Sequence, residues 1–247
     1  MEAQKFNAFT GLKVGKFKTV REYTPESISN SFREKYFEVL KQKKGGGYWL
    51  WKPWIIKNAL EQINYNELLF YSDSAAHFIQ PIDHIKKLPW DFEQDIIPFE
   101  LELPESDWTK RDAFKILNLD GFGYEKTNQR LASFIFLRKT EFTRHFINEY
   151  LNYCCNEQVL TDLPNLCGAS NFEGFKEHRH DQSIFSLLTK KYSLSPFRDP
   201  SQWGNPRVNE FNNSKYPQII EHTRQKSPKQ AKLYYKIKHW IFPTIYK

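Results

Sequence analysis

The sequence predicts an α/β fold, in which a single domain has a mostly parallel, Rossmann-like central sheet flanked by helices. The 247 residues suit one large domain, and a hydrophobic share of 40% is enough to form its core. The 10 glycines and 13 prolines are too few for a low-complexity or disordered chain. Runs typical of strands alternate with runs typical of helices, which predicts parallel strands joined by helical crossovers.

The elements of the first half follow from local composition and from apolar spacing. Residues 17–23 are rich in β-branched and aromatic side chains and are predicted as a short strand. Thr24 then supplies an N-cap, followed by a first-turn proline, for a helix over 25–40. Apolar residues at helical spacing predict a second helix over 54–63, and the apolar run over 67–71 is typical of a buried strand.

The second half continues the alternation. A capping-box pattern predicts a helix over 109–119, and an apolar run predicts a buried strand over 131–137. Amphipathic spacing predicts helices over 140–155 and 181–191. Three intervening segments are expected to be irregular, namely 89–104, 156–178 and 196–217.

The chain carries a formal net charge of +7 and is 17% aromatic, and both features suit an anionic partner. Nucleic acid, anionic lipid headgroups and phosphorylated small molecules are the classes that this composition allows. Because no recognisable nucleic-acid motif accompanies the charge, nucleic acid is not the expected partner. The three cysteines lack metal-binding spacing and favour a reducing compartment, and no segment is apolar enough to span a bilayer. The expected location is therefore the cytoplasm.

The segment over 45–53 (GGGYWLWKP) is the most unusual in the chain. Its glycines permit close backbone approach, while its aromatic rings and the Lys52 ammonium offer stacking faces and a cation. That combination suits a nucleotide or a sugar. The competing interpretation is a flexible turn that leads into an aromatic core helix, and the sequence leaves both open.

Two acidic residues occur where chemistry is expected. Asp73 directly follows a predicted strand, where it could hold a divalent cation that bridges a diphosphate, or could cap a turn. Asp181, in 178–183 (HRHDQS), lies at a predicted helix start, where it could act as a general base or as an N-cap. His178 and His180 are two residues apart and are unconvincing as an isolated metal pair.

Taken together, these motifs resemble a family of bacterial glycosyltransferases associated with capsule, O-antigen and lipopolysaccharide synthesis. The resemblance covers residues 17–195. The matching text is GGYWLWKP at 46–53, LLFYSD at 68–73, WTKRD at 108–112 and EHRHDQS at 177–183. The resemblance implies a GT-A-like domain over residues 1–225 that binds a nucleotide-sugar, followed by a separate segment over 226–247.

Carried over residue by residue, the resemblance implies roles in binding and catalysis. The donor-binding residues would be Gly47, Tyr48, Trp49, Lys52, Pro53, Asp73, Lys110, Arg111 and Asp112. Asp181 and Gln182 are the catalytic candidates and would face the transferred sugar and the acceptor. His178 and His180 are the candidates for binding the acceptor or the sugar.

The resemblance also implies a divalent metal, Mn²⁺ or Mg²⁺, at an Asp-x-Asp motif of which Asp73 is the first acid. Ala75 stands at the position of the second acid, and His222 could complete the site instead. A second departure lies at the N-terminus, where few residues precede the first predicted strand. Either residues 5–11 replace the additional strand that helps to hold the nucleotide base in the family, or the donor site is modified.

These expectations describe the transfer of a hexose from a nucleoside-diphosphate sugar, with a UDP-sugar as the expected donor, to a hydroxyl of a cell-surface glycan or glycolipid. If the anomeric carbon is inverted, Asp181 is the expected base. Under retention, Asp181 and Gln182 would instead position the sugar. Two alternatives stay open, namely an inactive GT-A-like module that binds glycan or a partner transferase and, with less support, a nucleic-acid-binding protein.

The C-terminal segment, residues 226–247, interleaves lysines with aromatic and aliphatic residues. This pattern is typical of a helix on an anionic membrane surface, and equally of a terminal helix docked on the domain. The first interpretation would place the protein peripherally on the inner face of the plasma membrane.

Overall fold

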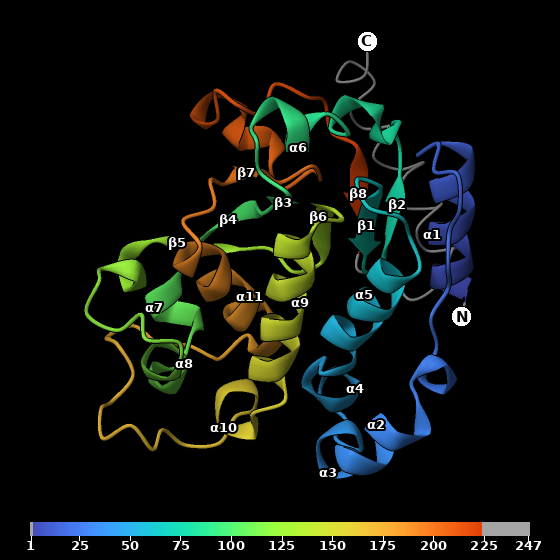
Figure 1. Ribbon diagram of the computed structural model, residues 1–247. Coiled ribbons are helices and arrows are strands. Elements are labelled where there is room, and N and C mark those ends of the chain that lie inside the picture. The colour runs from blue at the N-terminus through green and yellow to red at the C-terminus, as the bar shows by residue number, and fades with distance from the viewer. Residues whose placement is uncertain (1, 224–247) are drawn as a thin grey trace. The chain divides into compact units, whose positions relative to one another are not determined.

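The computed structural model describes residues 2–223 as a mixed α/β chain (Figure 1). The predicted helix over 226–247 lies outside the described residues. The chain divides into two compact units that interleave in sequence. Unit 1 consists of the residues up to Glu22, of Ser72–Lys86 and of the residues from Pro200 onward. Unit 2 consists of Tyr23–Tyr71 and Lys87–Asp199.

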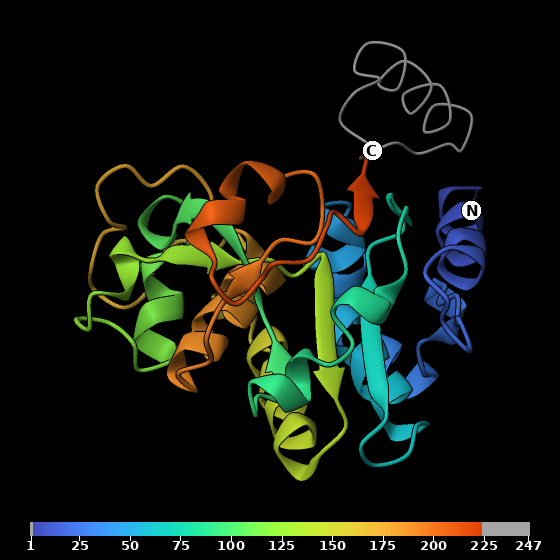
Figure 2. The ribbon, with the colours of Figure 1, turned by 90° about the horizontal axis from the view of Figure 1, so that it is seen from above.

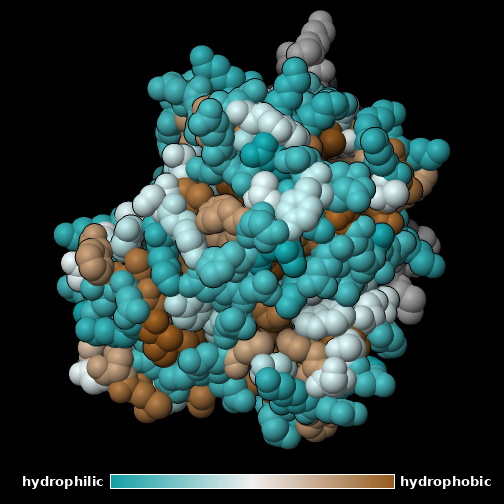
Figure 3. Space-filling model, viewed as in Figure 1, coloured by the Kyte–Doolittle hydropathy of each residue, from teal (hydrophilic) through white to brown (hydrophobic). Residues whose placement is uncertain are grey.

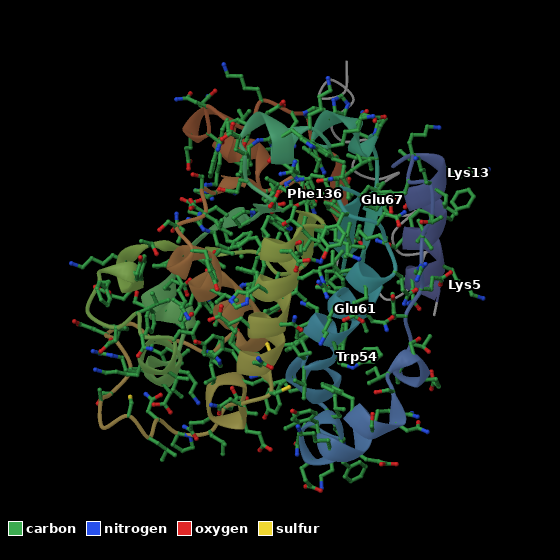
Figure 4. All side chains as sticks on the ribbon, viewed as in Figure 1. Lys5, Lys13, Trp54, Glu61, Glu67 and Phe136 are labelled. Carbon is green, nitrogen blue, oxygen red and sulfur yellow. The ribbon has the colours of Figure 1, made fainter. Side chains whose placement is uncertain are left out.

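The described residues of unit 1 form a helix and a pair of strands, and a hydrogen bond joins the helix to one of these strands. Helix α1 (Glu2–Lys13) lies against β2 (Ala76–Phe78), whose Phe78 N–H donates to the Thr10 hydroxyl at 3.1 Å. Strand β2 pairs antiparallel with β8 (Ile220–His222), and two 3₁₀ turns, η2 (Ile82–His84) and η4 (Asn205–Glu210), complete the described elements. Figure 4 shows Lys5 and Lys13 pointing away from α1.

Two expectations for the N-terminal region are wrong. Residues 5–11, which one of the two alternatives took as a replacement strand, lie within α1. Residues 17–23, expected to form a strand, form none. The Phe17 N–H donates to the Gly11 carbonyl at 3.2 Å, and the Phe17 ring packs edge-on against Phe78 with centroids 5.1 Å apart. The Phe17 ring therefore serves packing within unit 1 rather than strand pairing.

Unit 2 holds most of the helices and strands. Its helices are α2 (Asn30–Lys35), α3 (Phe37–Leu40), α4 (Gly45–Tyr48), α5 (Trp51–Glu61), α6 (Leu88–Asp91), α7 (Glu105–Trp108), α8 (Arg111–Ile116), α9 (Glu141–Cys154), α10 (Glu157–Leu160) and α11 (His180–Lys191), with 3₁₀ turns η1 (Pro25–Ser27) and η3 (Tyr124–Lys126). Its strands are β3 (Ile96–Ile97), β4 (Phe99–Pro104), β5 (Asn128–Arg130), β6 (Phe134–Arg138) and β7 (Phe197–Arg198). Strand β1 (Leu68–Ser72) ends at the boundary, because Ser72 belongs to unit 1.

Four predicted helices are confirmed as α5, α8, α9 and α11, and the two predicted strands at 67–71 and 131–137 as β1 and β6. Helix α9 begins where its capping residue predicts, since the Thr140 hydroxyl accepts the Thr143 N–H at 3.2 Å. The single helix expected over 25–40 is instead broken into η1, α2 and α3. The break after α2 occurs at Tyr36, whose backbone leaves the helical region with φ −113° and ψ 27°.

The three segments that were expected to be irregular contain regular structure. Strands β3 and β4 and all of helix α6 except its first residue lie in 89–104, α10 lies in 156–178 and β7 lies in 196–217. Apolar and acidic residues alternate along β4, a period of two that is typical of a strand with one buried face. The prolines and acidic residues around it concealed this signal.

The structure does not show a mostly parallel sheet. Strands β3 and β6 pair antiparallel, as do β4 and β5, whereas β4 and β7 pair parallel. The sheets are small, with strand orders β1-β6-β3, β2-β8 and β5-β4-β7. The expectation of parallel strands rested on alternating elements. Strands β3, β4, β5 and β7 were not among the predicted strands, and β3 and β5 pair antiparallel with β6 and β4.

The core of unit 2 is formed by α5, α9 and α11 together with β6. Figures 1 and 2 show α9 between α5 and α11, and residues of α9 contact both helices. Figure 4 shows Trp54 and Glu61 on α5 and Phe136 on β6. The largest fully buried side chains include Phe114, Phe134, Phe136, Phe146, Tyr150 and Phe185.

A buried ion pair fixes the far end of α11. The Glu105 carboxylate, fully buried at the start of α7, accepts a hydrogen bond from Lys190 Nζ at 2.6 Å and from the hydroxyls of Ser186 and Thr109. Because the lost hydration of both charges is replaced by these contacts, the pair holds α11 against α7.

The face seen in Figure 3 is mostly polar. Hydrophilic residues cover most of the face in Figure 3, and hydrophobic patches appear at the lower left, in the region of α8 and α10. Within residues 2–223, no helix combines the length and the apolar character needed to cross a membrane.

Candidate functional site

The triple-glycine segment forms an ordered left-handed turn. Gly45, Gly46, Gly47, Tyr48 and Trp49 all have positive φ, between 53° and 97°. Hydrogen bonds from Tyr48 N–H to the Lys44 carbonyl (2.7 Å) and from Trp49 N–H to the Gly45 carbonyl (3.3 Å) close the turn. Left-handed runs cost L-residues about 1–2 kcal/mol each, so Tyr48 and Trp49 are held against their backbone preference. The turn leads directly into α5 (Trp51–Glu61), as the competing interpretation of this segment expected, and its ligand-binding role stays a prediction.

This turn brings two aromatic rings to His180. The Trp49 ring stacks on the His180 ring at 5.8 Å and 21°, and the Tyr48 ring lies 4.9 Å from it at 56°. Gly45 is required here, because a Cβ at that position would lie 2.3 Å from the Trp49 ring. The Trp51 indole N–H donates to the Gly45 carbonyl at 2.9 Å and secures the turn from the following helix.

Lys52 and Asp181 form a buried ion pair at 2.7 Å, with each side chain only 4% exposed. Lys52 lies in the first turn of α5, while Asp181 lies in the first turn of α11, where helix N–H groups favour a negative charge. Lys52 Nζ also donates to the Ala132 carbonyl at 3.2 Å, and the Tyr150 hydroxyl donates to Asp181 Oδ2 at 3.3 Å. Burial, and then the Asp181 charge, raises the pKa of Tyr150 well above its usual value, so Tyr150 remains a donor.

Gln182 and Pro53 support this pair from the two helices. The Gln182 side chain accepts the Ala132 N–H at 3.4 Å and donates to Gln129 Oε1 at 2.9 Å. Pro53 is buried in the first turn of α5, where a backbone N–H would lack a partner within the helix. Ala132, which sequence reasoning missed, is thus contacted by both predicted motifs through its backbone.

Both ring nitrogens of His178 have hydrogen-bond partners within the protein, whereas only one ring nitrogen of His180 has such a partner. His178 Nδ1 accepts the Lys110 N–H at 3.3 Å and its Nε2 lies 2.8 Å from the Val159 carbonyl. His180 Nδ1 lies 2.8 Å from the Leu160 carbonyl, but its Nε2 is buried and has no hydrogen-bond partner among the described residues. Of the two predicted histidines, His180 therefore has the free hydrogen-bonding capacity.

The predicted residues of the WTKRD segment hold a loop of unit 2. Lys110 Nζ donates to the Leu163 carbonyl at 2.7 Å and to the Thr161 carbonyl at 3.3 Å. The Asp112 carboxylate accepts backbone N–H groups of 166 and 167 and a side-chain N–H of Gln158. Arg111 pairs with Asp120 at 2.7 Å and stacks on Phe172 at 4.1 Å. These contacts give the motif a structural role, and its donor-binding role stays a prediction.

The two predicted metal ligands both lie in unit 1. The Asp73 carbonyl accepts the Asn7 amide at 3.4 Å and the Ser72 hydroxyl at 3.2 Å. His222 is the register partner of Ala76 in the β2–β8 pair. No group of three or more His, Cys, Asp or Glu side chains that could hold a metal occurs within residues 2–223. The metal therefore stays a prediction.

No protein-family model, no curated protein and no solved structure matches the chain. The class that the described residues define is a mixed α/β protein, and its candidate site in unit 2 comprises the left-handed turn, the Lys52–Asp181 pair and His180.

We expect acidification below pH 6.5 to destabilise the protein. Burial lowers the pKa of His180, and lowers that of His178 well below its ordinary value. Their contribution to stability is complete above pH 6.5, the ordinary value of an unfolded histidine, and is lost as the pH falls, because only the unfolded chain then takes up these protons. The slope should approach about 1.4 kcal/mol per pH unit from His178, whose pKa is lowered well below its ordinary value, with a smaller contribution from His180. Urea unfolding at pH 7.5, 6.5 and 5.5 measures it.

The control for this measurement is His178→Gln, which removes one titrating group while its amide can still donate to the Val159 carbonyl. The slope should decrease in this variant. An unchanged slope would show that His178 is not one of the groups responsible.

Proposed function

We propose that the protein is a glycosyltransferase with a GT-A-like fold, which transfers a hexose from a nucleoside-diphosphate sugar to a hydroxyl of a cell-surface glycan or glycolipid. A UDP-sugar is the proposed donor. The observation that supports this proposal best is the Lys52–Asp181 ion pair, because it joins two motifs that are far apart in sequence and that carry the family resemblance. The stacking of Trp49 on His180 joins the same two motifs a second time.

In the proposed reaction, the bond from the anomeric carbon to the diphosphate breaks, and a bond to the acceptor oxygen forms. The acceptor hydroxyl loses its proton, and the diphosphate leaves with the bonding electrons. Cationic side chains or a divalent metal would stabilise the negative charge on the leaving diphosphate. The proposed metal is Mn²⁺ or Mg²⁺, with Asp73 and His222 as its candidate ligands.

The contacts of Asp181 favour a positioning role over that of a general base. Its Oδ2 already accepts hydrogen bonds from Lys52 and Tyr150, and its side chain is 4% exposed. A group that must take a proton from an acceptor needs access to that acceptor. We therefore propose that Asp181, with Gln182, orients the elements around the transferred sugar.

A panel of nucleotide-sugars tests this function directly. UDP-glucose, UDP-galactose, UDP-N-acetylglucosamine and GDP-mannose would be added to the full chain, with Mn²⁺ or with EDTA, and the Tm recorded. We expect at least one donor to raise the Tm by several degrees, because a ligand at 100 times its Kd stabilises the native state by about 2.7 kcal/mol. No shift and no transfer or hydrolysis with any donor would refute the proposal, and activity that survives exhaustive chelation would remove the metal from it.

A catalytically inactive GT-A-like module is the second candidate. Ala75 stands where the second acid of an Asp-x-Asp motif would be, and this observation favours binding without catalysis. A donor that binds in the panel but is neither transferred nor hydrolysed would select this candidate.

A further inference from the structure

His180 presents a buried hydrogen-bond acceptor that the protein itself does not use. Its Nδ1 lies 2.8 Å from the Leu160 carbonyl, and because a carbonyl can only accept, Nδ1 carries the proton. In the neutral ring, Nε2 therefore holds a lone pair. Nε2 is buried without a hydrogen-bond partner among the described residues, in a side chain that is 3% exposed. Burial lowers the pKa of His180, so this lone pair is present at neutral pH.

A surface ion pair lies beside this nitrogen. Asp162 Oδ1 is 3.8 Å from His180 Nε2, which is too far for a hydrogen bond, and Asp162 Oδ2 is paired with Lys44 Nζ at 3.0 Å. The Asp162 and Lys44 side chains are 44% and 43% exposed, so solvent reaches the pair. The carboxylate and the ammonium thus offer an acceptor and a donor to solvent, and the buried Nε2 offers a second acceptor 3.8 Å from the carboxylate.

The same place concentrates backbone strain. Tyr48, Trp49 and His180 all have positive φ, although none of them is glycine, and their rings contact one another through His180. Such conformations cost about 1–3 kcal/mol each, and a buried unsatisfied acceptor adds about 1–3 kcal/mol. Two independent costs at one cluster are typical of a ligand site.

We propose that His180 Nε2 and the Asp162 carboxylate accept hydrogen bonds from neighbouring hydroxyls of one sugar ring. The Lys44 ammonium donates to one of these hydroxyl oxygens, and the half-buried rings of Tyr48 and Trp49 provide the adjoining apolar surface. Two acceptors 3.8 Å apart suit adjacent hydroxyl donors. The inference rests on the proposed function in taking the ligand to be a sugar, which belongs either to the donor or to the acceptor.

Histidine ¹⁵N NMR of the full chain tests the contact without requiring activity. The probes are the four nucleotide-sugars, free UDP, and free glucose and galactose at high concentration. We expect a sugar to shift the Nε2 resonance of His180, while His178, whose nitrogens are both engaged, serves as the internal reference. A shift with free hexose but with no nucleotide-sugar would uphold this inference and assign the ring to the acceptor. The proposed function would fail separately, if no nucleotide-sugar raised the Tm and none was transferred or hydrolysed. If no sugar shifts His180, the inference fails.

His180→Asn is the decisive variant. Asparagine tolerates positive φ, and its amide can still donate to the Leu160 carbonyl, but it lacks the acceptor at the position of Nε2. We expect a folded variant with lower stability, because the ring contacts with Tyr48 and Trp49 are lost, and an affinity for the shifting sugar probe that is about tenfold lower, as loss of one hydrogen bond implies. Asp162→Asn should lower this affinity too, whereas His145→Asn, on the exposed face of α9, should not.

The variant also separates the two sources of the sugar. If the ring belongs to the donor, His180→Asn weakens binding of the nucleotide-sugar and leaves free UDP unaffected. If it belongs to the acceptor, nucleotide-sugar binding is unchanged and the loss appears with free hexose. Wild-type affinity of His180→Asn for every probe would overturn the inference.

Discussion

Asp181→Asn is expected to lower the free energy of unfolding by about 3 kcal/mol and to reduce kcat for sugar transfer by at least about 100-fold. The substitution keeps the shape of the side chain and its hydrogen bond with Tyr150, but it removes the negative charge that faces Lys52 at 2.7 Å. Both side chains are 4% exposed, so solvent cannot hydrate the Lys52 ammonium in place of the lost carboxylate charge. Urea unfolding and steady-state kinetics with the donor found in the panel measure the two effects.

Glu105→Gln is the matched control for this substitution. It removes the carboxylate of another buried pair on α11, in which Lys190 lies 2.6 Å from Glu105, and should destabilise the protein to a similar extent. If Asp181 positions the sugar, Asp181→Asn should have a lowered kcat and Glu105→Gln a kcat close to that of the wild type. Both are measured under conditions in which the two variants are folded. Equal kcat values in the two variants would show that Asp181 stabilises α11 but does not position the sugar.

The pair itself is tested by a double-mutant cycle. Lys52→Met alone should also be destabilising, and the double variant Lys52→Met/Asp181→Asn should lose less than the sum of the two single variants. Additive losses would show that the two charges do not stabilise each other.

Gly47→Ala is expected to lower the free energy of unfolding by about 3 kcal/mol or more. A Cβ at this position would lie 2.6 Å from Leu40 Cα and 3.1 Å from the Val39 carbonyl, and backbone atoms cannot move aside as a flexible side chain can. The φ of 97° adds strain for any residue with a side chain. Urea unfolding measures the loss, and Trp fluorescence reports the displacement of the adjoining turn.

Gly121→Ala separates the cost of backbone strain from the cost of a steric clash at the new Cβ. Gly121 has a similar φ of 86°, but a Cβ there would meet nothing within 4 Å. This variant should lose only about 1 kcal/mol, from the left-handed backbone alone. Losses of equal size at the two positions would mean that the contact with Leu40 contributes nothing.

Sequence signals predicted the elements whose causes are local. Thr140 caps α9 through a hydrogen bond to the Thr143 N–H, and an amphipathic pattern continues through Cys154, so this helix was predictable almost to its ends. The break at Tyr36 had no such signal, because neighbouring residues on both sides favour a helix. Strand β4 was missed since its alternation is surrounded by proline and acidic residues.

The candidate site was predictable as a set of residues but not as a set of contacts. The resemblance named Lys52, Asp181 and His180, yet neither the ion pair nor the acceptor at Nε2 follows from spacing. Lys44 and Asp162 were missed altogether, since nothing in their local sequence distinguishes them from other exposed charges. His178 was named for binding, although its two nitrogens serve Lys110 and the Val159 carbonyl.

By itself, the sequence determined the basic, aromatic character of the chain, the positions of its main helices, and the segments that hold the candidate site. Each of these depends on residues that are close together in the chain, where composition and periodicity act directly. Only the tertiary structure decided the direction of the strands, the left-handed path of Gly45–Tyr48 and the partners of Asp181. These depend on contacts between distant residues, because three glycines permit either hand and a buried charge accepts whichever partner the packing brings to it.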